Sequence, residues 1–293
     1  IKKLKHHCLL QFIGYSLYDF EQRKKSVLIT ELTTNGCLND VLQIVRNDNE
    51  NELISEWNET KKLINIYGIA KGMSYLHNNG IIHRSLNPEN IYLDEILSPK
   101  IGDFGLMTDF VDFNDLKNQS YMINNVENTR YSAPEVLQSN EYSKCSDVYA
   151  FGLIVFEIMS NEIPFNDIDN SNEIYIEVVN KKNRPKLNKM IPKKYQDLIN
   201  KCWNQDPDKR PSFDEIVNEL ESDSEFITEK VNKIEYQKYL KLVGQQIDIE
   251  SNTQNDESSL SDQVNQKCES NNEINKLYPN FNDEIETEQR NPN

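Results

Sequence analysis

Hydrophobic residues recur at helical spacing between about Thr60 and His77. They occupy positions i, i+3, i+4, i+7 and i+10, namely Leu63, Ile66, Tyr67, Ala70 and Met73. This spacing predicts one helix with an apolar face. The residues at 78–80 are Asn, Asn and Gly, which tolerate the left-handed conformation at a helix C-terminus, so we expect the helix to end there.

Shorter apolar runs predict strands and further helices around this segment. Residues 9–18 and 26–32 are rich in Leu, Ile, Val, Phe and Tyr, and the charged segment 19–25 between them predicts an antiparallel strand pair. Residues 91–93 and 100–102 are two more strand-like pieces. Helices are predicted at 147–160, 172–180, 194–203 and 213–220.

The pattern weakens toward the C-terminus. Residues 222–248 carry apolar side chains in a loosely helical order, which predicts a small docking appendage. From Ser251 onward Asn, Gln, Ser, Asp and Glu dominate, and burial of so few apolar groups cannot offset the entropy lost on ordering. We expect residues 251–293 to be disordered.

Five short motifs follow one another in a fixed order. Residues 83–90 read His-Arg-Ser-Leu-Asn-Pro-Glu-Asn, and residues 103–105 read Asp-Phe-Gly. The other motifs are Thr-Arg-Tyr-Ser-Ala-Pro-Glu at 129–135, Asp-Val-Tyr-Ala-Phe-Gly at 147–152, and Cys-Trp-Asn-Gln-Asp-Pro at 202–207 leading to Arg-Pro at 210–211. One short motif has a real false-positive rate, but five in register are specific.

These motifs and their spacing resemble those of protein kinases, and the last one is similar to the ending of the tyrosine-kinase-like group. The resemblance covers residues 1–221 and implies an α+β protein-kinase fold, a mostly helical large lobe with a remnant of the β-rich small lobe. The expected divisions are a small-lobe remnant with the start of the hinge at 1–32, the large lobe at 33–221, a helical extension at 222–250 and the acidic tail at 251–293.

The catalytic loop departs from the kinase pattern at two positions. In the signature H-R-D-L-x-x-x-N the Asp accepts the substrate hydroxyl proton, and here Ser85 stands in its place. A serine hydroxyl cannot serve as a carboxylate base at neutral pH, and general acid–base catalysis contributes about 10²–10⁴-fold in rate. Asn87 replaces the usual Lys, so a positive charge near the transferred phosphoryl group is also lost.

The resemblance implies that Asn90 and Asp103 are magnesium ligands, since both supply the hard oxygens that this cation prefers. A kinase small lobe also supplies a glycine-rich flap, a lysine and a glutamate. None of the nine glycines stands in a G-x-G arrangement, and Ile1 aligns just beyond the expected glutamate. The sequence begins with Ile rather than Met, so an incomplete amino terminus is one explanation of these absences.

The nucleotide pocket is ambiguous. The resemblance places Thr30 at the gatekeeper position, and Glu31 and Thr33 in the hinge that binds adenine. Tyr92 stands where the family usually has Leu beneath the adenine ring, so its bulk either fills part of that space or belongs to ordinary core packing. We expect ATP and Mg²⁺ to bind weakly or not at all.

Other matches concern structure and regulation. Asp147 resembles the aspartate that holds the catalytic loop, and Glu135 with Arg210 resembles an ion pair that anchors the segment after the activation loop. In active relatives Arg84 pairs with a phosphate on that loop. Candidate acceptors are Thr108, Ser120, Tyr121 and Thr129, although nearby Asp residues or plain solvation are alternatives.

Composition narrows the partners and the compartment. A formal net charge of -16 argues against nucleic-acid and anionic-lipid partners. Five scattered cysteines without C-x-x-C spacing favour a reducing, cytoplasmic location and no structural zinc, and we expect His6 and His7 to be surface residues. The most apolar stretch, 150–159, is shorter than the roughly 20 residues of a bilayer span.

The main functional hypothesis is a pseudokinase-like signalling domain that binds other signalling proteins or kinases and transfers little phosphate. The alternative is an active ATP-dependent serine/threonine kinase of which this sequence is an amino-terminally truncated part. A degenerate, barely stable remnant is a third interpretation, and the complete apolar pattern of the large lobe argues against it. The sequence names no substrate, no particular partner and no oligomeric state, and fold resemblance alone does not establish function.

Overall fold

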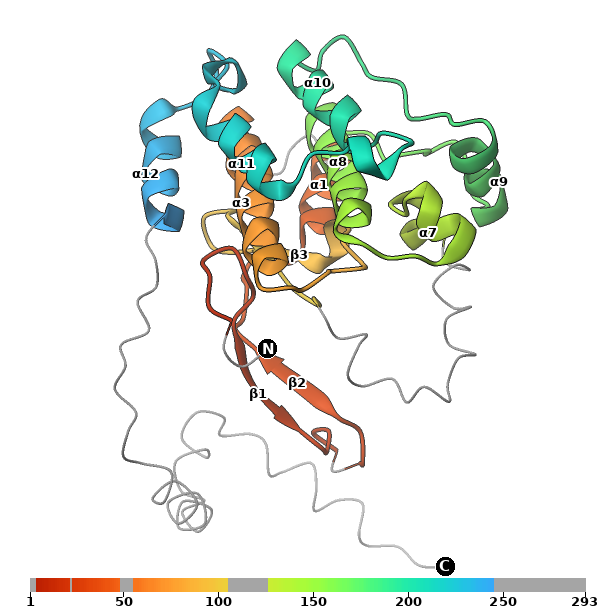
Figure 1. The fold of residues 1–293 in the computed structure, drawn as a ribbon. Coiled ribbons are helices and arrows are strands. Elements are labelled where there is room, and N and C mark those ends of the chain that lie inside the picture. The colour runs from red at the N-terminus through yellow and green to blue at the C-terminus, as the bar shows by residue number, and fades with distance from the viewer. Residues whose placement is uncertain (1–3, 22, 48–54, 105–125, 245–293) are drawn as a thin grey trace, which may run out of the picture. The chain divides into compact units, whose positions relative to one another are not determined.

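The computed structural model describes residues 4–21, 23–47, 55–104 and 126–244 (Figure 1). The predicted disordered tail lies outside these residues. The elements in chain order are β1 (Phe12–Ser16), β2 (Val27–Thr30), α1 (Leu38–Asn47), α3 (Glu59–Asn78), η1 (Pro88–Asn90), β3 (Ile91–Leu93), β4 (Pro99–Ile101), α6 (Val126–Arg130), α7 (Pro134–Ser139), α8 (Lys144–Ser160), α9 (Ser171–Tyr175), η3 (Ile176–Asn180), α10 (Lys193–Cys202), η4 (Pro207–Lys209), α11 (Phe213–Ser222), η5 (Ser224–Phe226) and α12 (Lys233–Gly244).

The predicted central helix is confirmed as α3. Its N-terminus is capped by Asn58, whose side chain accepts hydrogen bonds from the backbone N–H groups of Thr60 and Lys61. The helix ends at Asn78, as the Asn-Asn-Gly sequence predicts. It packs against α8, α11, α12 and β4, so it forms the centre of the helical body (Figure 1).

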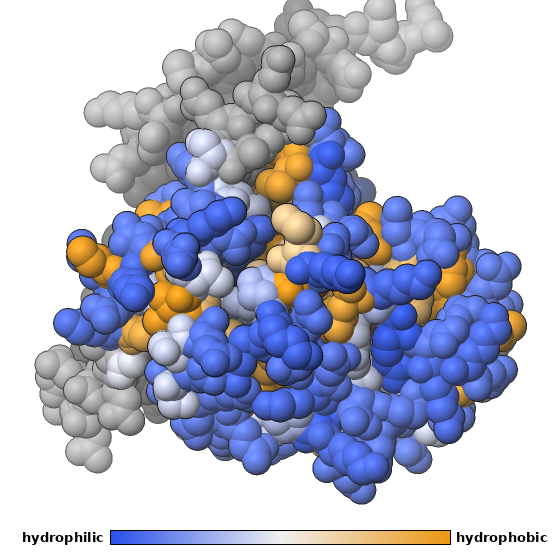
Figure 2. Space-filling model, turned by 90° about the horizontal axis from the view of Figure 1, so that it is seen from above, coloured by the Kyte–Doolittle hydropathy of each residue, from blue (hydrophilic) through white to orange (hydrophobic). Residues whose placement is uncertain are grey.

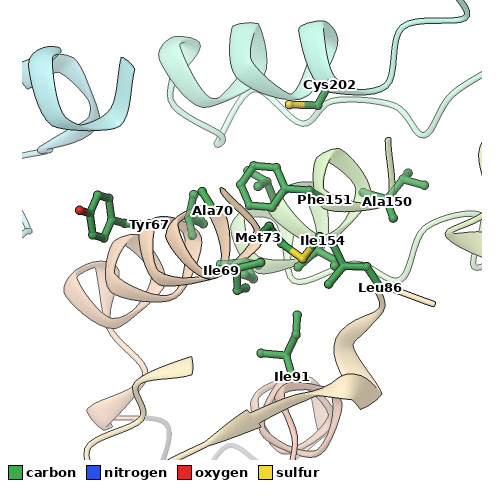
Figure 3. Close-up of a cluster of buried hydrophobic side chains, with 14 of the residues drawn as sticks. Tyr67, Ile69, Ala70, Met73, Leu86, Ile91, Ala150, Phe151, Ile154 and Cys202 are labelled. Carbon is green, nitrogen blue, oxygen red and sulfur yellow. The ribbon is translucent and has the colours of Figure 1, made fainter. Parts of the chain in front are cut away.

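The core lies between α3 and α8 and contains the predicted apolar face. Figure 3 shows side chains of both helices meeting there, together with residues from the segments that follow α3 and from α10. The labelled members are Tyr67, Ile69, Ala70, Met73, Leu86, Ile91, Ala150, Phe151, Ile154 and Cys202. Helix α8 begins with a capping box in which the side chains of Ser143 and Ser146 bond each other's backbone N–H groups.

The two predicted strand pairs are present as separate two-stranded sheets. β1 and β2 are antiparallel, with Phe12 opposite Thr30, and this hairpin extends away from the helices (Figure 1). β3 and β4 are antiparallel, with Ile91 opposite Ile101. The Cys8 carbonyl accepts the Ile101 N–H and the Leu10 N–H donates to the Ile101 carbonyl, both at 2.8 Å, so the amino-terminal segment joins the β4 edge.

Apolar side chains of the hairpin and its flanking residues are exposed, in contrast to those of the helical body. Phe20 is 93% exposed and Ile13 is 65% exposed. The other large apolar residues exposed in this region are Tyr15, Leu17, Tyr18, Leu28, Ile29 and Leu32. The hairpin is therefore held mainly by its backbone pairing.

The predicted helix at 172–180 differs from a single α-helix. It begins as α9 and continues as the π-helical turn η3. The loosely helical pattern after residue 222 contains η5 and α12. The result is a mixed α and β protein in which helices predominate, as expected for a kinase domain.

The surface agrees with the polar composition. Figure 2 shows a face on which hydrophilic residues dominate and hydrophobic residues form separate small patches. None of the helices in the described part of the chain is both long enough and apolar enough to cross a lipid bilayer.

Candidate functional site

The catalytic-loop segment is held by Asp147, which lies buried in the first turn of α8. Its Oδ2 accepts the backbone N–H of His83 at 2.8 Å, and its Oδ1 accepts that of Arg84 at 2.9 Å. The Nε2 atom of His77 lies 2.8 Å from Oδ2. Arg84 has a φ of 71°, an uncommon backbone conformation that these contacts stabilise. The loop is therefore fixed in place independently of any ligand.

Ser85 and Asn90 are joined within this loop. The Asn90 Nδ2 group donates to the Ser85 carbonyl at 2.7 Å and to its Oγ at 3.2 Å. Gly102 N–H donates to the Asn90 carbonyl at 2.9 Å, which ties the loop to the residue before Asp103. Because the amide nitrogen is engaged by Ser85, the Asn90 Oδ1 atom remains as the ligand-type oxygen.

Asn87 has a structural role that sequence reasoning missed. Its Oδ1 accepts the backbone N–H groups of Glu89 at 2.9 Å and Asn90 at 3.2 Å, so it caps η1. Its Nδ2 donates to Asn128 Oδ1 at 3.3 Å, and the residue is only 5% exposed. The signal was readable, because Asn directly before Pro is typical of a helix N-cap.

Five of the predicted site residues line one open cavity of about 310 Å³. They are Thr30, Glu31, Thr33, Tyr92 and Asp103, and the remaining lining residues are Leu10, Phe12, Leu28, Leu32 and Phe104. Ser85 and Asn87 line a different cavity, together with Arg84 and Thr129. The sequence-predicted nucleotide residues are thus brought together, while the two altered catalytic positions lie apart from them.

The hinge residue Glu31 is held to the amino-terminal segment and to β4. Its Oε1 accepts the backbone N–H of Gln11 at 2.8 Å and the Lys100 ammonium at 3.0 Å. Its own N–H donates to the Gln11 carbonyl at 2.9 Å. Glu31 also lines the cavity, and its role as a hinge residue stays a prediction of the resemblance.

Tyr92 lies against the backbone that carries Asp103. A Cβ added at Gly102 would lie 2.6 Å from the Cε2 atom of Tyr92, so the ring requires glycine there. Burial raises the pKa of the Tyr92 phenol, and the negative charge of the nearby Asp103 raises that pKa further. Asp103 has a φ of 54°. The phenol therefore stays neutral and stands beside the predicted metal ligand.

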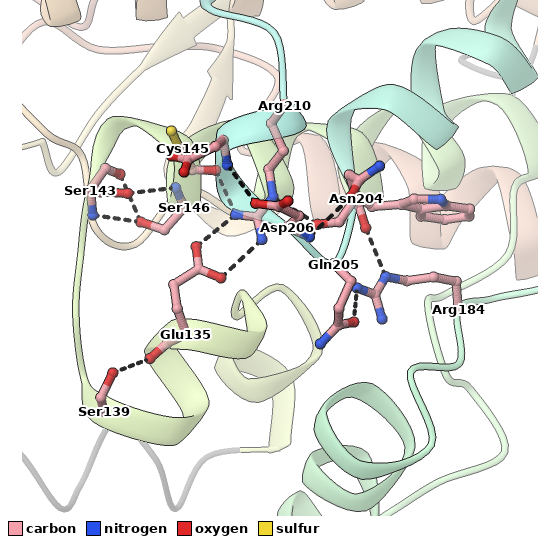
Figure 4. Close-up of polar contacts among 12 residues, drawn as sticks. Glu135, Ser139, Ser143, Cys145, Ser146, Arg184, Asn204, Gln205, Asp206 and Arg210 are labelled. Atoms are coloured by element: carbon pink, nitrogen blue, oxygen red, sulfur yellow. Dashed lines mark hydrogen bonds and ion pairs between the residues drawn. The ribbon is translucent and has the colours of Figure 1, made fainter.

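The predicted Glu135–Arg210 ion pair is present and bidentate. Arg210 Nη1 lies 2.6 Å from Glu135 Oε1, and Nη2 donates to Oε2 at 2.9 Å (Figure 4). The same guanidinium donates to the carbonyls of Cys145 and Asn204 at 2.9 and 2.8 Å. The fork geometry of arginine satisfies four acceptor atoms at once.

Of the four predicted phosphate acceptors, one lies within the described residues. Thr129 is buried, with its Oγ1 3.3 Å from Ser171 Oγ, whereas Thr108, Ser120 and Tyr121 lie outside the described residues. Among the residues with described positions, no group of three or more His, Cys, Asp or Glu side chains is placed to hold a metal ion.

His6, expected to be a surface residue, is half-buried in the structure. Its ring stacks on Tyr75 with centroids 5.0 Å apart, and Nδ1 accepts the Cys8 N–H at 3.1 Å. Burial, followed by the nearby positive charges of His7 and Lys71, lowers the pKa of His6 to about 4.

Comparison with known proteins gives a consistent result. Residues 1–220 match the family described as protein tyrosine and serine/threonine kinase. The chain is 40% identical over 153 residues to a probable serine/threonine-protein kinase of Dictyostelium discoideum, covering 52% of this chain and 16% of that protein. It is 34% identical over 195 residues to the dual specificity protein kinase pyk3 of the same organism, covering 67% and 13%.

A plant relative extends the range of this similarity. The serine/threonine-protein kinase STY17 of Arabidopsis thaliana is 30% identical over 221 residues, which covers 75% of this chain and 35% of that protein. The chain thus spans only about a third or less of the length of these three relatives. Helix α12 lies beyond the matched residues 1–220.

Proposed function

Because the chain belongs to the protein tyrosine and serine/threonine kinase family, we propose that it is a kinase-fold signalling domain with little phosphoryl transfer of its own. The observation that carries this proposal is the hydroxyl of Ser85 at the position of the catalytic base. That hydroxyl is bonded to Asn90, and no carboxylate takes its place in the matched loop. The loss of a general base is worth about 10²–10⁴-fold in rate.

Asn87 supports the same proposal. A lysine at this position would place a mobile cation toward the transferred phosphoryl group, whereas the Asn87 side chain is occupied by capping η1 and by Asn128. The loop is therefore built around a neutral, buried amide. This arrangement is complete as a structural unit without the charge that phosphoryl transfer needs.

The chain keeps groups that fit magnesium and a nucleotide. Asn90 and Asp103 would supply an amide carbonyl and a carboxylate oxygen, and Glu31, Thr33 and Thr30 would form the adenine side of the cavity. Bound magnesium neutralises phosphate charge. Tyr92 adds a bulky ring to the lining of that cavity, so we infer weak binding of ATP and Mg²⁺ or none.

The working role of such a domain is partner binding. We propose other signalling proteins or kinases as partners, a cytoplasmic location and membership of the tyrosine-kinase-like group. The acidic composition disfavours nucleic-acid partners. The expected domain boundaries are 1–32, 33–221, 222–250 and 251–293, with the last part acting as a disordered tail.

A second candidate is an active serine/threonine kinase. The specific observation in its favour is that the relatives described above are named as serine/threonine-protein or dual specificity kinases. Under this alternative Ser85 would be tolerated and a longer chain would supply the rest of the small lobe. The two proposals differ in the rate of phosphoryl transfer.

A phosphotransfer assay with labelled ATP, Mg²⁺ and a general acceptor protein separates them. We expect the unaltered chain to label the acceptor at least about 10²-fold more slowly than the kinase domain of pyk3 under the same conditions. Ser85→Asp with Asn87→Lys tests whether these two positions limit the rate, and Ser85→Ala is the matched control. Transfer at the rate of the relative would refute the proposal.

A thermal-shift titration tests nucleotide binding separately. We expect no magnesium-dependent stabilisation at micromolar ATP. Tyr92→Leu should increase any stabilisation, because it removes bulk from the cavity lining next to Gly102. A micromolar, magnesium-dependent shift of the unaltered chain would show that Tyr92 does not obstruct the site.

A further inference from the structure

Helix α12 is seated in a notch on α3 that only glycine can provide. A Cβ added at Gly68 would lie 2.2 Å from the hydroxyl oxygen of Tyr239 and 2.5 Å from Cγ of Pro99. The ring of Tyr67 contacts Tyr239 edge-on, with centroids 6.2 Å apart. Tyr239 is 6% exposed. A helix outside the matched kinase residues therefore inserts a tyrosine into the centre of the helical body.

The Tyr239 hydroxyl reaches the amino-terminal segment. It lies 3.4 Å from Sγ of Cys8, a residue 231 positions away in the sequence. Burial raises the pKa of the Cys8 thiol to about 12, so this contact joins two neutral groups at physiological pH. Cys8 is fully buried, and a Cβ added at Gly72 would lie 3.1 Å from its Cβ and its carbonyl oxygen. Gly68 and Gly72 thus lie one helical turn apart and admit Tyr239 and Cys8.

Cys8 in turn holds the strand that leads to Asp103. The Ile101 N–H donates to the Cys8 carbonyl, and the Leu10 N–H donates to the Ile101 carbonyl, both at 2.8 Å. Asp103 follows two residues after Ile101. Leu10 and Asp103 both line the nucleotide cavity. Two contacts therefore link Tyr239 to β4: the contact of its hydroxyl with the Cys8 side chain, and the backbone hydrogen bond between Cys8 and Ile101.

The amino-terminal end of α12 is fixed by separate contacts. The Lys61 ammonium lies 2.6 Å from Glu235 Oε1, and the Asn232 N–H donates to Thr60 Oγ1 at 2.8 Å. Both contacts lie at the beginning of α3. Removal of the Tyr239 hydroxyl alone should therefore leave α12 in place, which makes a clean test feasible.

We propose that Tyr239 is a positioning residue that uses Cys8 to hold the β4 edge and so fixes the backbone preceding Asp103. Helix α12 then stabilises the candidate nucleotide site from within the same chain. A partner contact that displaces α12 from α3 would then loosen the backbone preceding Asp103. The relevance to nucleotide rests on the function proposed above, but the mechanical coupling does not.

Amide hydrogen exchange of the whole chain tests this coupling in the absence of nucleotide. The variant is Tyr239→Phe, and the matched control is Tyr236→Phe, which removes a hydroxyl from the same helix. That hydroxyl is buried and has no hydrogen-bond partner among the described residues. Both variants keep a ring that can pack edge-on against Tyr67.

We expect Tyr239→Phe to accelerate exchange at Leu10 and Ile101 roughly two- to tenfold, the range of one net hydrogen bond. Tyr236→Phe should leave these amides unchanged, and the amide of Ile154 in the core should not change in either variant. Equal acceleration in both variants, acceleration spread evenly over the chain, or no change in Tyr239→Phe would each overturn the proposal.

A double-mutant cycle adds a second test. Cys8→Ala removes the other end of the contact, so combining it with Tyr239→Phe should accelerate Ile101 no more than either change alone. Additive acceleration would show that the two side chains act separately. A failed nucleotide titration leaves this exchange result standing, so the two proposals can fail independently.

Discussion

The helical body and the β1–β2 hairpin both line the nucleotide cavity, but they hold their side chains in different ways. The body contributes Tyr92, Asp103 and Phe104; the Tyr92 ring packs against Gly102, and Phe104 belongs to the continuous core. The hairpin contributes Phe12, Leu28 and Thr30 from a sheet whose apolar side chains are largely exposed. One wall of the cavity is thus preorganised by packing, and the other depends on backbone pairing.

The sharpest test of the body is the loss of its buried ion pair. Arg210→Ala leaves Glu135 without a partner, and removal of one member of a buried pair costs about 3 to 5 kcal/mol. The matched control is Lys209→Ala, because Lys209 and Asp206 form an exposed pair 3.5 Å apart. Urea unfolding should show the large loss only for Arg210→Ala. Equal losses would show that the Glu135–Arg210 pair does not preorganise the body.

The amino-terminal segment that contains His6 connects the hairpin to the β4 edge of the body. We expect acid to lower the free energy of unfolding through protonation of His6. Its folded-state pKa of about 4 lies below the ordinary value of 6.5, so protonation favours the unfolded chain. The stability that the neutral ring contributes is complete above pH 6.5 and is lost as the pH falls toward 4. Between pH 7.5 and pH 5 we expect a loss of about 2 kcal/mol that His6→Gln does not show.

The measurement is the free energy of unfolding of both proteins in urea across this pH range. The difference between them should be constant above pH 7 and should change only below 6.5. An identical pH dependence of the two proteins would mean that the ring is solvated and that the segment containing His6 is as loosely held as the hairpin.

A smaller effect is expected at the cap of the catalytic loop. Asn87→Ala removes the acceptor for two backbone N–H groups of η1, and loss of an N-cap costs about 1 kcal/mol. Asn87→Asp keeps the cap and is the control. Thermal unfolding should rank Asn87→Ala below both Asn87→Asp and the unaltered chain. No difference between the two variants would show that the cap does not stabilise the loop.

The smallest effect is expected on the hairpin. Ile13→Ser should change the unfolding free energy by no more than about 0.5 kcal/mol, because substitutions at exposed positions rarely exceed that range. Ile154→Val in the core removes only one methylene group, yet it should cost about 0.5 to 1.5 kcal/mol. If Ile13→Ser proved more costly than Ile154→Val, the face of the hairpin would be covered in solution.

Much of the body could be predicted because its signals are local or repeated. The 3.6-residue period predicts α3, and the ordered motifs predict that Glu135 meets Arg210 across the fold. Asn87 as a cap was also readable from its position before Pro88. The predictions of α3 and of the ion pair succeed because the first depends on residues close in sequence and the second on a spacing that only one fold satisfies, whereas the Asn87 cap was missed although its signal was local.

Other features depend on distances that the sequence does not encode locally. The contact between Tyr239 and Cys8 joins residues that no periodicity relates, and it requires the notch at Gly68. The partial burial of His6 follows from stacking on Tyr75, which belongs to a different element. The exposure of the hairpin was not predictable either, because alternation of apolar residues indicates a strand but not what covers its faces.

The packing of α12 on α3 has a practical consequence for recombinant fragments whose ends follow the family match at residues 1–220. A fragment that ends at residue 220 would lack α12, so the Tyr67 ring and the notch at Gly68 would be exposed to water. Such an exposed apolar surface invites self-association. Recombinant fragments should extend through residue 244, so that the domain is delimited by what packs together rather than by what aligns.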